Sequence, residues 1–340
     1  MAPRAFICGL EGTDLADDER AFLRDTQPWG LMLFKRNIAD PEQIRRLCGA
    51  SREALGRDAP ILIDQEGGRV QRIGPPHLRA YPAGAVYGDL YSRDPLLGVE
   101  AVYLGARLIA LDLLNLGIDV DCVPVLDLPA EGLTPAIGDR TLGFTADAVA
   151  TLGRAQAEGL MSGGVLPVMK HMPGHGRAKV DSHQELPRVE ASLRDLEATD
   201  LAPFRLLAPI VPLGMTAHVV FAEIDADAPT TLSAKVIARL IRGRIGFDGA
   251  LMTDDISMGA LTGDLGGRAE RAIAAGCDLV LHCSGELAEA AEIARSVPEL
   301  AGYALRRTDA ALAFRRPPEA GDRGALEARF ESLLARTVIA

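Results

Sequence analysis

The sequence predicts a (β/α)8 TIM-like barrel, an α/β fold in which eight parallel strands alternate with helices. Short apolar segments alternate with amphipathic helical segments along all 340 residues. Most of these apolar segments are hydrophobic on both faces, as parallel strands covered by helices are. No Gly-x-Gly-x-x-Gly motif follows the first of them, which disfavours a doubly wound open sheet, the main alternative fold.

The expected strands are short apolar runs, and each is separated from the next by a longer helical pattern. In chain order they are Ala5–Leu10, Gly30–Lys35, Pro60–Asp64, Asp119–Leu128, Leu166–His171, Leu213–Val220, Gly249–Asp255 and Asp278–Cys283.

The expected helices follow from apolar periodicity and from signals at their ends. Acidic residues fill the first turn after Ala16, and Asp40 followed by Pro41 is typical of a helix start. The helices are expected over Ala16–Gln27, Asp40–Leu55, Asp94–Leu116, Thr145–Ser162, Ser192–Leu207, Ser233–Gly246 and Ala269–Gly276, with a charged helical stretch at the end. Without repeats or low-complexity linkers, residues 1–340 are expected to form a single domain with extra C-terminal helices.

Composition and charge exclude several classes of protein. A net charge of −11 argues against nucleic-acid binding, and no basic run suggests a membrane surface. The first apolar stretch is too short for a signal peptide. The longest apolar stretch, Leu206–Ala222, contains two prolines and a histidine, so a buried strand with its approach is expected there rather than a membrane span. The five cysteines form no Cys-x-x-Cys pair, which favours free thiols in a reducing cytoplasm. A monomer is expected.

Ionisable residues stand at the ends of six expected strands. Because the carboxyl ends of parallel barrel strands meet on one face, these residues favour an active site there. They are Asp64, Asp127, Lys170 with His171, His218, Asp254 with Asp255, and His282.

Several polar residues, in this list and in neighbouring loops, also have a purely structural explanation. Asp64 can cap the next turn, and Arg140 can pair with its neighbour Asp139. For Arg69, an internal salt bridge is the preferred interpretation. His218 is as readily explained as a hydrogen-bonded core residue, and so is His282.

The segment Lys170–His183 holds half of the six histidines. A zinc site is disfavoured because Pro-Gly-His-Gly forbids a helix that carries both His171 and His175. Asp181, two residues before His183, can instead orient the imidazole and raise its proton affinity. The glycines and the lack of apolar anchors predict a mobile, lid-like loop.

Four segments, IDQEGGRVQR, IGDRTLG, KHMPGHG…DSH and LMTDD, closely resemble the bacterial β-N-acetylhexosaminidases of glycoside hydrolase family 3. The resemblance extends from about Gly9 to Cys283. It implies a short cytosolic enzyme with one barrel domain that removes terminal N-acetylglucosamine from cell-wall fragments during peptidoglycan recycling. These fragments are GlcNAc-1,6-anhydro-MurNAc muropeptides. It implies no metal and no organic cofactor.

The resemblance also assigns roles. Asp254 is the nucleophile, His183 the general acid/base, and Asp181 the residue that orients His183. Residues that bind the sugar hydroxyls are Asp64, Arg72, Arg140, Lys170 and His171. Met172 stands where many members have an aromatic residue. A retaining mechanism needs a nucleophile and a proton donor on opposite sides of the bond, and an Asp–His pair can replace the second carboxylic acid.

Neighbouring strand residues point to opposite sides, so Asp254 and Asp255 cannot both face the substrate equally. Asp255 is expected to hold the loop by hydrogen bonds.

Because Lys170 is interpreted as a substrate-binding residue, Lys170→Ala is expected to weaken turnover with little change in melting temperature.

Three alternatives remain at this stage. An N-acetylglucosaminide phosphorylase uses the same site with phosphate as acceptor. A metal-dependent barrel hydrolase or aldolase uses His171, His175 and His218 with an aspartate as ligands. A non-catalytic sugar-binding barrel is the third, and a retained nucleophile with its Asp–His pair argues against it.

Overall fold

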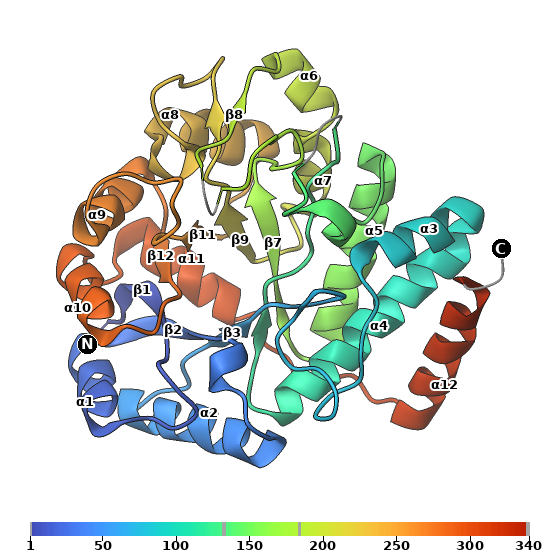
Figure 1. Ribbon diagram of the computed structural model, residues 1–340, viewed down its shortest axis with the longest axis horizontal. Coiled ribbons are helices and arrows are strands. Elements are labelled where there is room, and N and C mark those ends of the chain that lie inside the picture. The colour runs from blue at the N-terminus through green and yellow to red at the C-terminus, as the bar shows by residue number, and fades with distance from the viewer. Residues whose placement is uncertain (1, 131–133, 183–184, 338–340) are drawn as a thin grey trace.

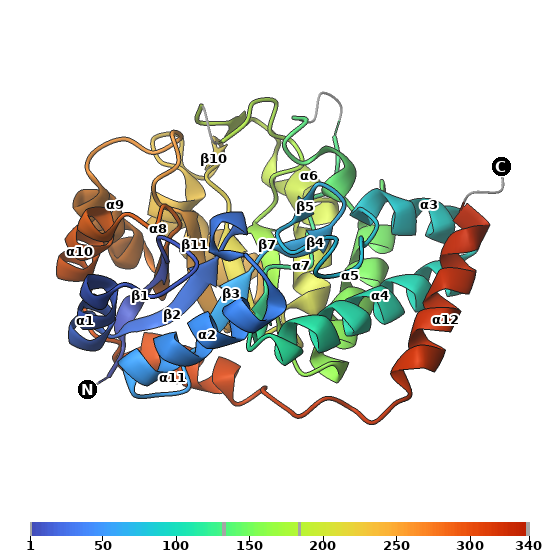
Figure 2. The same ribbon diagram turned by 60° about the horizontal axis from the view of Figure 1, so that its bottom comes forward.

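The computed structural model describes residues 2–130, 134–182 and 185–337 and confirms the predicted barrel (Figures 1 and 2). Eight strands close in the order β1-β2-β3-β6-β7-β9-β11-β12, and every neighbouring pair is parallel. The strands are β1 (Arg4–Gly9), β2 (Pro28–Leu33), β3 (Ile61–Ile63), β6 (Val120–Asp121), β7 (Leu166–Met172), β9 (Leu213–Thr216), β11 (Ala250–Asp255) and β12 (Leu279–His282).

All expected strands are found, although β6 is much shorter than the predicted segment. Pro124 lacks the N–H that a strand ladder needs, so regular pairing ends before it. The chain nevertheless continues beside β7, because the backbone N–H of Leu126 donates to the carbonyl of Lys170 at 2.8 Å.

The helices surround the barrel, and side chains cap several of them. Asp40 accepts a hydrogen bond from the backbone N–H of Gln43 at 2.8 Å, as an N-cap does. The helices are α1 (Asp17–Thr26), α2 (Pro41–Leu55), α3 (Gly84–Arg93), α4 (Pro95–Asn115), α5 (Ala146–Ser162), α6 (Leu193–Ala198), α7 (Leu201–Leu207), α8 (Ala234–Val236), the π-helix η4 (Ile237–Ile245), α9 (Leu265–Ala275), α10 (Leu287–Ser296), α11 (Gly302–Leu312) and α12 (Arg323–Leu334).

Three helical regions differ from the prediction. The expected helix Ser192–Leu207 is divided into α6 and α7 at Thr199, whose hydroxyl donates to the neighbouring Asp200. Most of the expected helix Ser233–Gly246 is a π-helix, Ile237–Ile245. Helix α3 was not predicted: its Gly84 and Gly88 lower helix propensity, but they allow the close approach of the Arg140–Leu142 backbone.

The extra C-terminal helices are confirmed. Figure 2 shows α11 below the barrel and a connection that runs on to α12 beside α4. Phe330 of α12 is fully buried, and Arg323 Nη2 lies 2.5 Å from Asp112 Oδ1 of α4. Across the described residues, every helix is too short or too polar to span a lipid bilayer. The five cysteines are free thiols, as expected.

Two small sheets lie outside the barrel ladder. The antiparallel pair β4 (Gln65–Gly67) and β5 (Val70–Gln71) follows β3 directly. The parallel pair β8 (Arg188–Val189) and β10 (Val220–Phe221) joins the segments that follow β7 and β9. Both pairs therefore organise chain at the carboxyl ends of barrel strands, where the predicted site residues lie.

Candidate active site

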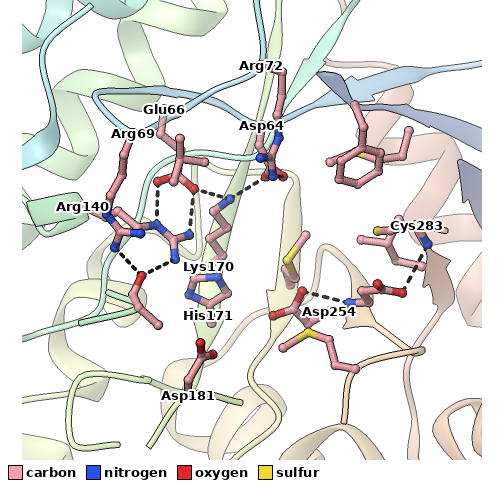
Figure 3. Close-up of a pocket in the computed structure, with 18 residues that line it drawn as sticks. Asp64, Glu66, Arg69, Arg72, Arg140, Lys170, His171, Asp181, Asp254 and Cys283 are labelled. Carbon is pink, nitrogen blue, oxygen red and sulfur yellow. Dashed lines mark hydrogen bonds and ion pairs between the residues drawn. The ribbon is translucent and has the colours of Figure 1, made fainter. Parts of the chain in front are cut away.

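A cavity of about 360 Å³ lies at the carboxyl ends of the barrel strands (Figure 3). The structure brings into it every predicted site residue that it describes, namely Asp64, Arg72, Arg140, Lys170, His171, Asp181 and Asp254. His183 lies outside the described residues, so its role and its pairing with Asp181 stay predictions. Sequence reasoning gave no role to Phe34, Glu66, Met215 or Met258, which also line the cavity.

Lys170 lies between two carboxylates on one wall of the cavity. Its Nζ is 2.8 Å from Asp64 Oδ1 and 2.7 Å from Glu66 Oε1, and the residue is only 2% exposed. Burial alone would lower the pKa of Lys170, but the two carboxylates outweigh burial and raise that pKa above its ordinary value. The amine is therefore a fixed cation at the end of β7.

Arg140 and Glu66 form a bidentate ion pair. Arg140 Nε donates to Glu66 Oε2 and Nη2 donates to Oε1, each at 2.8 Å (Figure 3). The alternative pairing of Arg140 with Asp139 is wrong, because Asp139 Oδ1 accepts from Arg69 Nε at 2.9 Å. That contact confirms the salt bridge expected for Arg69. A planar guanidinium fits both carboxylate oxygens, which explains the preference for Glu66.

Asp64 is paired on two sides. It accepts a hydrogen bond from Arg72 Nη2 at 2.7 Å and one from Lys170 at 2.8 Å, so a role as a simple turn cap is wrong. Burial raises the pKa of Asp64, but the charges of Lys170 and Arg72 have the larger effect and hold that pKa well below its usual range. The Arg72 guanidinium also lies 5.3 Å from the centre of the Phe34 ring, a cation–π contact at the cavity wall.

Asp127 orients the cavity histidine. Its Oδ2 accepts from His171 Nδ1 at 2.6 Å, and its Oδ1 accepts from the backbone N–H of His175 at 2.6 Å. Burial raises the pKa of Asp127, but the two histidines lower it to about 2. The carboxylate therefore fixes the ring plane of His171 in the cavity wall.

The two aspartates that end β11 have different environments. Both line the cavity, but they differ in their hydrogen bonds: Asp254 Oδ1 accepts from the backbone N–H of Asp255 at 2.8 Å. Burial raises the pKa of Asp254, but His171 and His218 lower it below its usual value. Asp255 holds the loop, as expected, because it accepts bonds from the N–H of Cys283 and from both donors of Ser257.

The remaining strand-end histidines are core residues. His218 Nδ1 is 2.7 Å from Thr231 Oγ1 and its Nε2 is 2.9 Å from the carbonyl of Asp255. His282 Nε2 is 3.0 Å from Glu289 Oε2. These bonds occupy the nitrogens that the metal-dependent alternative requires of His218. Among the described residues, no three His, Cys, Asp or Glu side chains are grouped to hold a metal ion.

The chain between Met172 and Ser182 returns to the cavity by a packed route. Met172 and Ala178 are fully buried in the hydrophobic core, so the expected lack of apolar anchors is wrong for this part. His175 Nε2 and Ser182 Oγ share a buried hydrogen bond of 3.1 Å. Figure 3 shows Asp181 with its carboxylate directed toward the cavity, below His171.

Comparisons with known proteins agree with this geometry. Residues 7–311 match the glycosyl hydrolase family 3 N-terminal domain. A β-hexosaminidase of Alkalilimnicola ehrlichii is 41% identical over 281 residues, which cover 82% of this chain and 80% of that protein. A β-hexosaminidase of Bordetella pertussis is 36% identical over 292 residues, which cover 85% of this chain and 82% of that protein.

Solved structures give the same result. NagZ from Neisseria gonorrhoeae in complex with N-trifluoroacetyl-D-glucosamine superposes with a TM-score of 0.86 at 31% identity, covering 99% of this chain and 98% of that one. A family 3 β-N-acetylglucosaminidase from Paenibacillus superposes with a TM-score of 0.84 at 31% identity, covering 98% of this chain and 66% of that one.

Proposed function

The chain belongs to the β-hexosaminidases of glycoside hydrolase family 3, and on that premise we propose that it removes terminal non-reducing N-acetylglucosamine with retention of configuration. The observation that carries the proposal is the position of Asp254. It is a half-buried carboxylate at the end of β11, in a cavity whose lining combines apolar side chains with charged groups that can hydrogen bond to sugar hydroxyls.

The reaction proceeds by two displacements. A carboxylate oxygen of Asp254 attacks the anomeric carbon, and the bond to the leaving oxygen breaks as His183 gives that oxygen a proton. Water then attacks the same carbon, His183 takes the proton from the water, and the ester to Asp254 breaks. Asp181 holds the imidazole in the orientation that both proton transfers need.

The paired charges support recognition of a neutral sugar. Asp64, Arg140, Lys170 and His171 are fixed by ion pairs and hydrogen bonds, and each keeps further donor or acceptor capacity for hydroxyl groups. Because these side chains are already held in place, little conformational entropy is lost when the sugar binds. The cavity of about 360 Å³ is near the small end of ligand sites, about 300–1,000 Å³, which suits one sugar unit and exo action.

The natural substrates in this proposal are peptidoglycan fragments, GlcNAc-1,6-anhydro-MurNAc muropeptides, that the protein hydrolyses as a cytoplasmic monomer during cell-wall recycling. Relatives that share the barrel are named β-hexosaminidases, and NagZ binds an N-acylglucosamine analogue. The same residues are compatible with phosphate as the acceptor in place of water. Comparing turnover rates with and without phosphate separates hydrolysis from phosphorolysis.

The decisive experiment traps the covalent intermediate. A slow-reacting fluorinated N-acetylglucosaminide should add its mass to the peptide that carries Asp254, and Asp254→Asn should abolish both the label and turnover. The first product should have the anomeric configuration of the substrate, as judged by NMR. A label on Asp255 would contradict the assignment of the nucleophile, and an inverted product without a label would contradict the mechanism.

A further inference from the structure

Glu66 makes contact with two of the cations that face the cavity. The carboxylate belongs to β4, which begins two residues after β3 ends at Ile63, and the residue is 6% exposed. One oxygen, Oε1, accepts from Arg140 Nη2 at 2.8 Å and lies 2.7 Å from Lys170 Nζ. The other, Oε2, accepts from Arg140 Nε at 2.8 Å. A single side chain therefore links the cations of two separate segments, η2 (Gly138–Arg140) and β7.

Arg140 depends on Glu66 as a partner more than Lys170 does. Lys170 has a second carboxylate in Asp64, so it keeps a partner without Glu66. Glu66 is the carboxylate that pairs with the Arg140 guanidinium, whose Nη1 also donates to the carbonyl of Ala136 at 3.2 Å. The orientation of Arg140 therefore depends on both oxygens of Glu66, because a bidentate pair fixes the plane of the guanidinium.

Glu66 also sets the charge of this wall. Burial raises the pKa of Glu66, but Lys170 and Arg140 lower it below its usual value, so the carboxylate stays ionised near pH 7. It offsets positive charge that would otherwise attract anions into the cavity. A partly desolvated guanidinium without a carboxylate partner is a preferred binding site for sulfate or phosphate.

We propose that Glu66 is a positioning and specificity-determining residue that aims Arg140 and Lys170 at a neutral sugar and prevents small anions from occupying the same cavity. This inference rests on the proposed glycosidase function. It assigns to Glu66 two separable effects, one of geometry and one of charge.

Two substitutions separate these effects. Glu66→Gln keeps the length and removes the charge, and it should lower kcat/KM for a chromogenic N-acetylglucosaminide by roughly ten- to a hundredfold, the range for a charge-assisted hydrogen bond. Sulfate should become a competitive inhibitor with an inhibition constant roughly tenfold or more below that of the wild type. Glu66→Asp keeps the charge but is too short for the bidentate pair, so kcat/KM should fall while sulfate inhibition stays as in the wild type.

Glu158→Gln is the matched control, because this glutamate makes an exposed pair with Arg154 on α5. It should change neither quantity. Folding of each variant is checked by its melting temperature, and sulfate binding is measured a second time as a thermal shift. Unchanged sulfate inhibition in Glu66→Gln, or equal inhibition in Glu66→Gln and Glu66→Asp, would overturn the charge role of Glu66. Failure of the wild type to cleave the substrate would instead contradict the proposed function.

Discussion

Replacing Lys170 with methionine should destabilise the fold as well as impair turnover. Methionine retains most of the apolar stem but removes the cation between Asp64 Oδ1 and Glu66 Oε1, at 2.8 and 2.7 Å. Removing one member of a buried ion pair typically costs about 3–5 kcal/mol. Since Asp64 keeps Arg72 and Glu66 keeps Arg140, we expect a loss near the lower end, about 3 kcal/mol.

Urea unfolding at pH 7 measures this loss, and turnover is measured on the same samples. Arg154→Met is the control: its side chain is 62% exposed, so its pair with Glu158 should contribute less than about 1 kcal/mol. The structure-based expectation for Lys170 differs from the sequence-based one, which was a change in turnover with little change in melting temperature. A loss for Lys170→Met no larger than that of the control would refute the reasoning.

The pH dependence gives a second check on the same variant. The pKa values of Asp64 and Glu66 are lowered in the folded protein, so the stability they contribute is present above their ordinary pKa values and is lost as the pH falls. Lys170 causes part of that lowering. The difference in unfolding free energy between wild type and Lys170→Met should therefore narrow below about pH 4. A constant difference down to pH 3 would contradict an ionic origin.

Two further predictions concern buried polar groups. Asp121 is fully buried and accepts from the N–H of Gln65 at 2.9 Å, and burial raises its pKa to about 8. Asp121 in the folded protein thus keeps a proton that the unfolded chain has released. The unfolding free energy of the wild type should therefore fall relative to that of Asp121→Asn by about 1.4 kcal/mol per pH unit from pH 5 to 8. Unfolding free energies with the same pH dependence in both proteins would refute this. Ser182→Ala removes the hydrogen bond to His175, so the unfolding free energy should fall by roughly 1 kcal/mol. Because Asp181 directly precedes this anchor, kcat should fall more for a disaccharide than for an activated aryl glycoside. Equal losses of kcat on both substrates would argue against the anchoring role.

Most of the fold was predictable because barrel strands are buried on both faces. Continuous apolar runs such as Leu279–Leu281 reveal such strands without any information about their neighbours. Helix α3 was missed because its formation depends on tertiary contact: Gly84 and Gly88 disfavour a helix locally but allow close packing on the Arg140–Leu142 backbone. Local propensity carries no information about that partner.

The site was predictable to the extent that chain position determines it. Asp64, Lys170 and Asp254 lie close to the carboxyl ends of barrel strands, and parallel topology brings such ends together regardless of sequence separation. Partner choice was not predictable. Asp139 adjoins Arg140 in the sequence, yet Glu66, 74 residues away, provides both carboxylate oxygens. Only the folded backbone determines which carboxylate reaches the guanidinium in the correct plane.

Closure of the barrel has a consequence for biosynthesis. The first strand pairs with the last, since Phe6 of β1 lies opposite Val280 of β12, roughly 270 residues later in the chain. At typical translation rates of about 5–20 residues per second, a ribosome needs roughly 15–55 s to produce that partner. Throughout this interval one edge of the apolar segment Arg4–Gly9 has no strand beside it, and unpaired edges promote association between chains. The edge of β1 that pairs with β12 is therefore the last barrel edge to find its partner during synthesis, whereas the finished barrel is closed and leaves no strand edge unpaired.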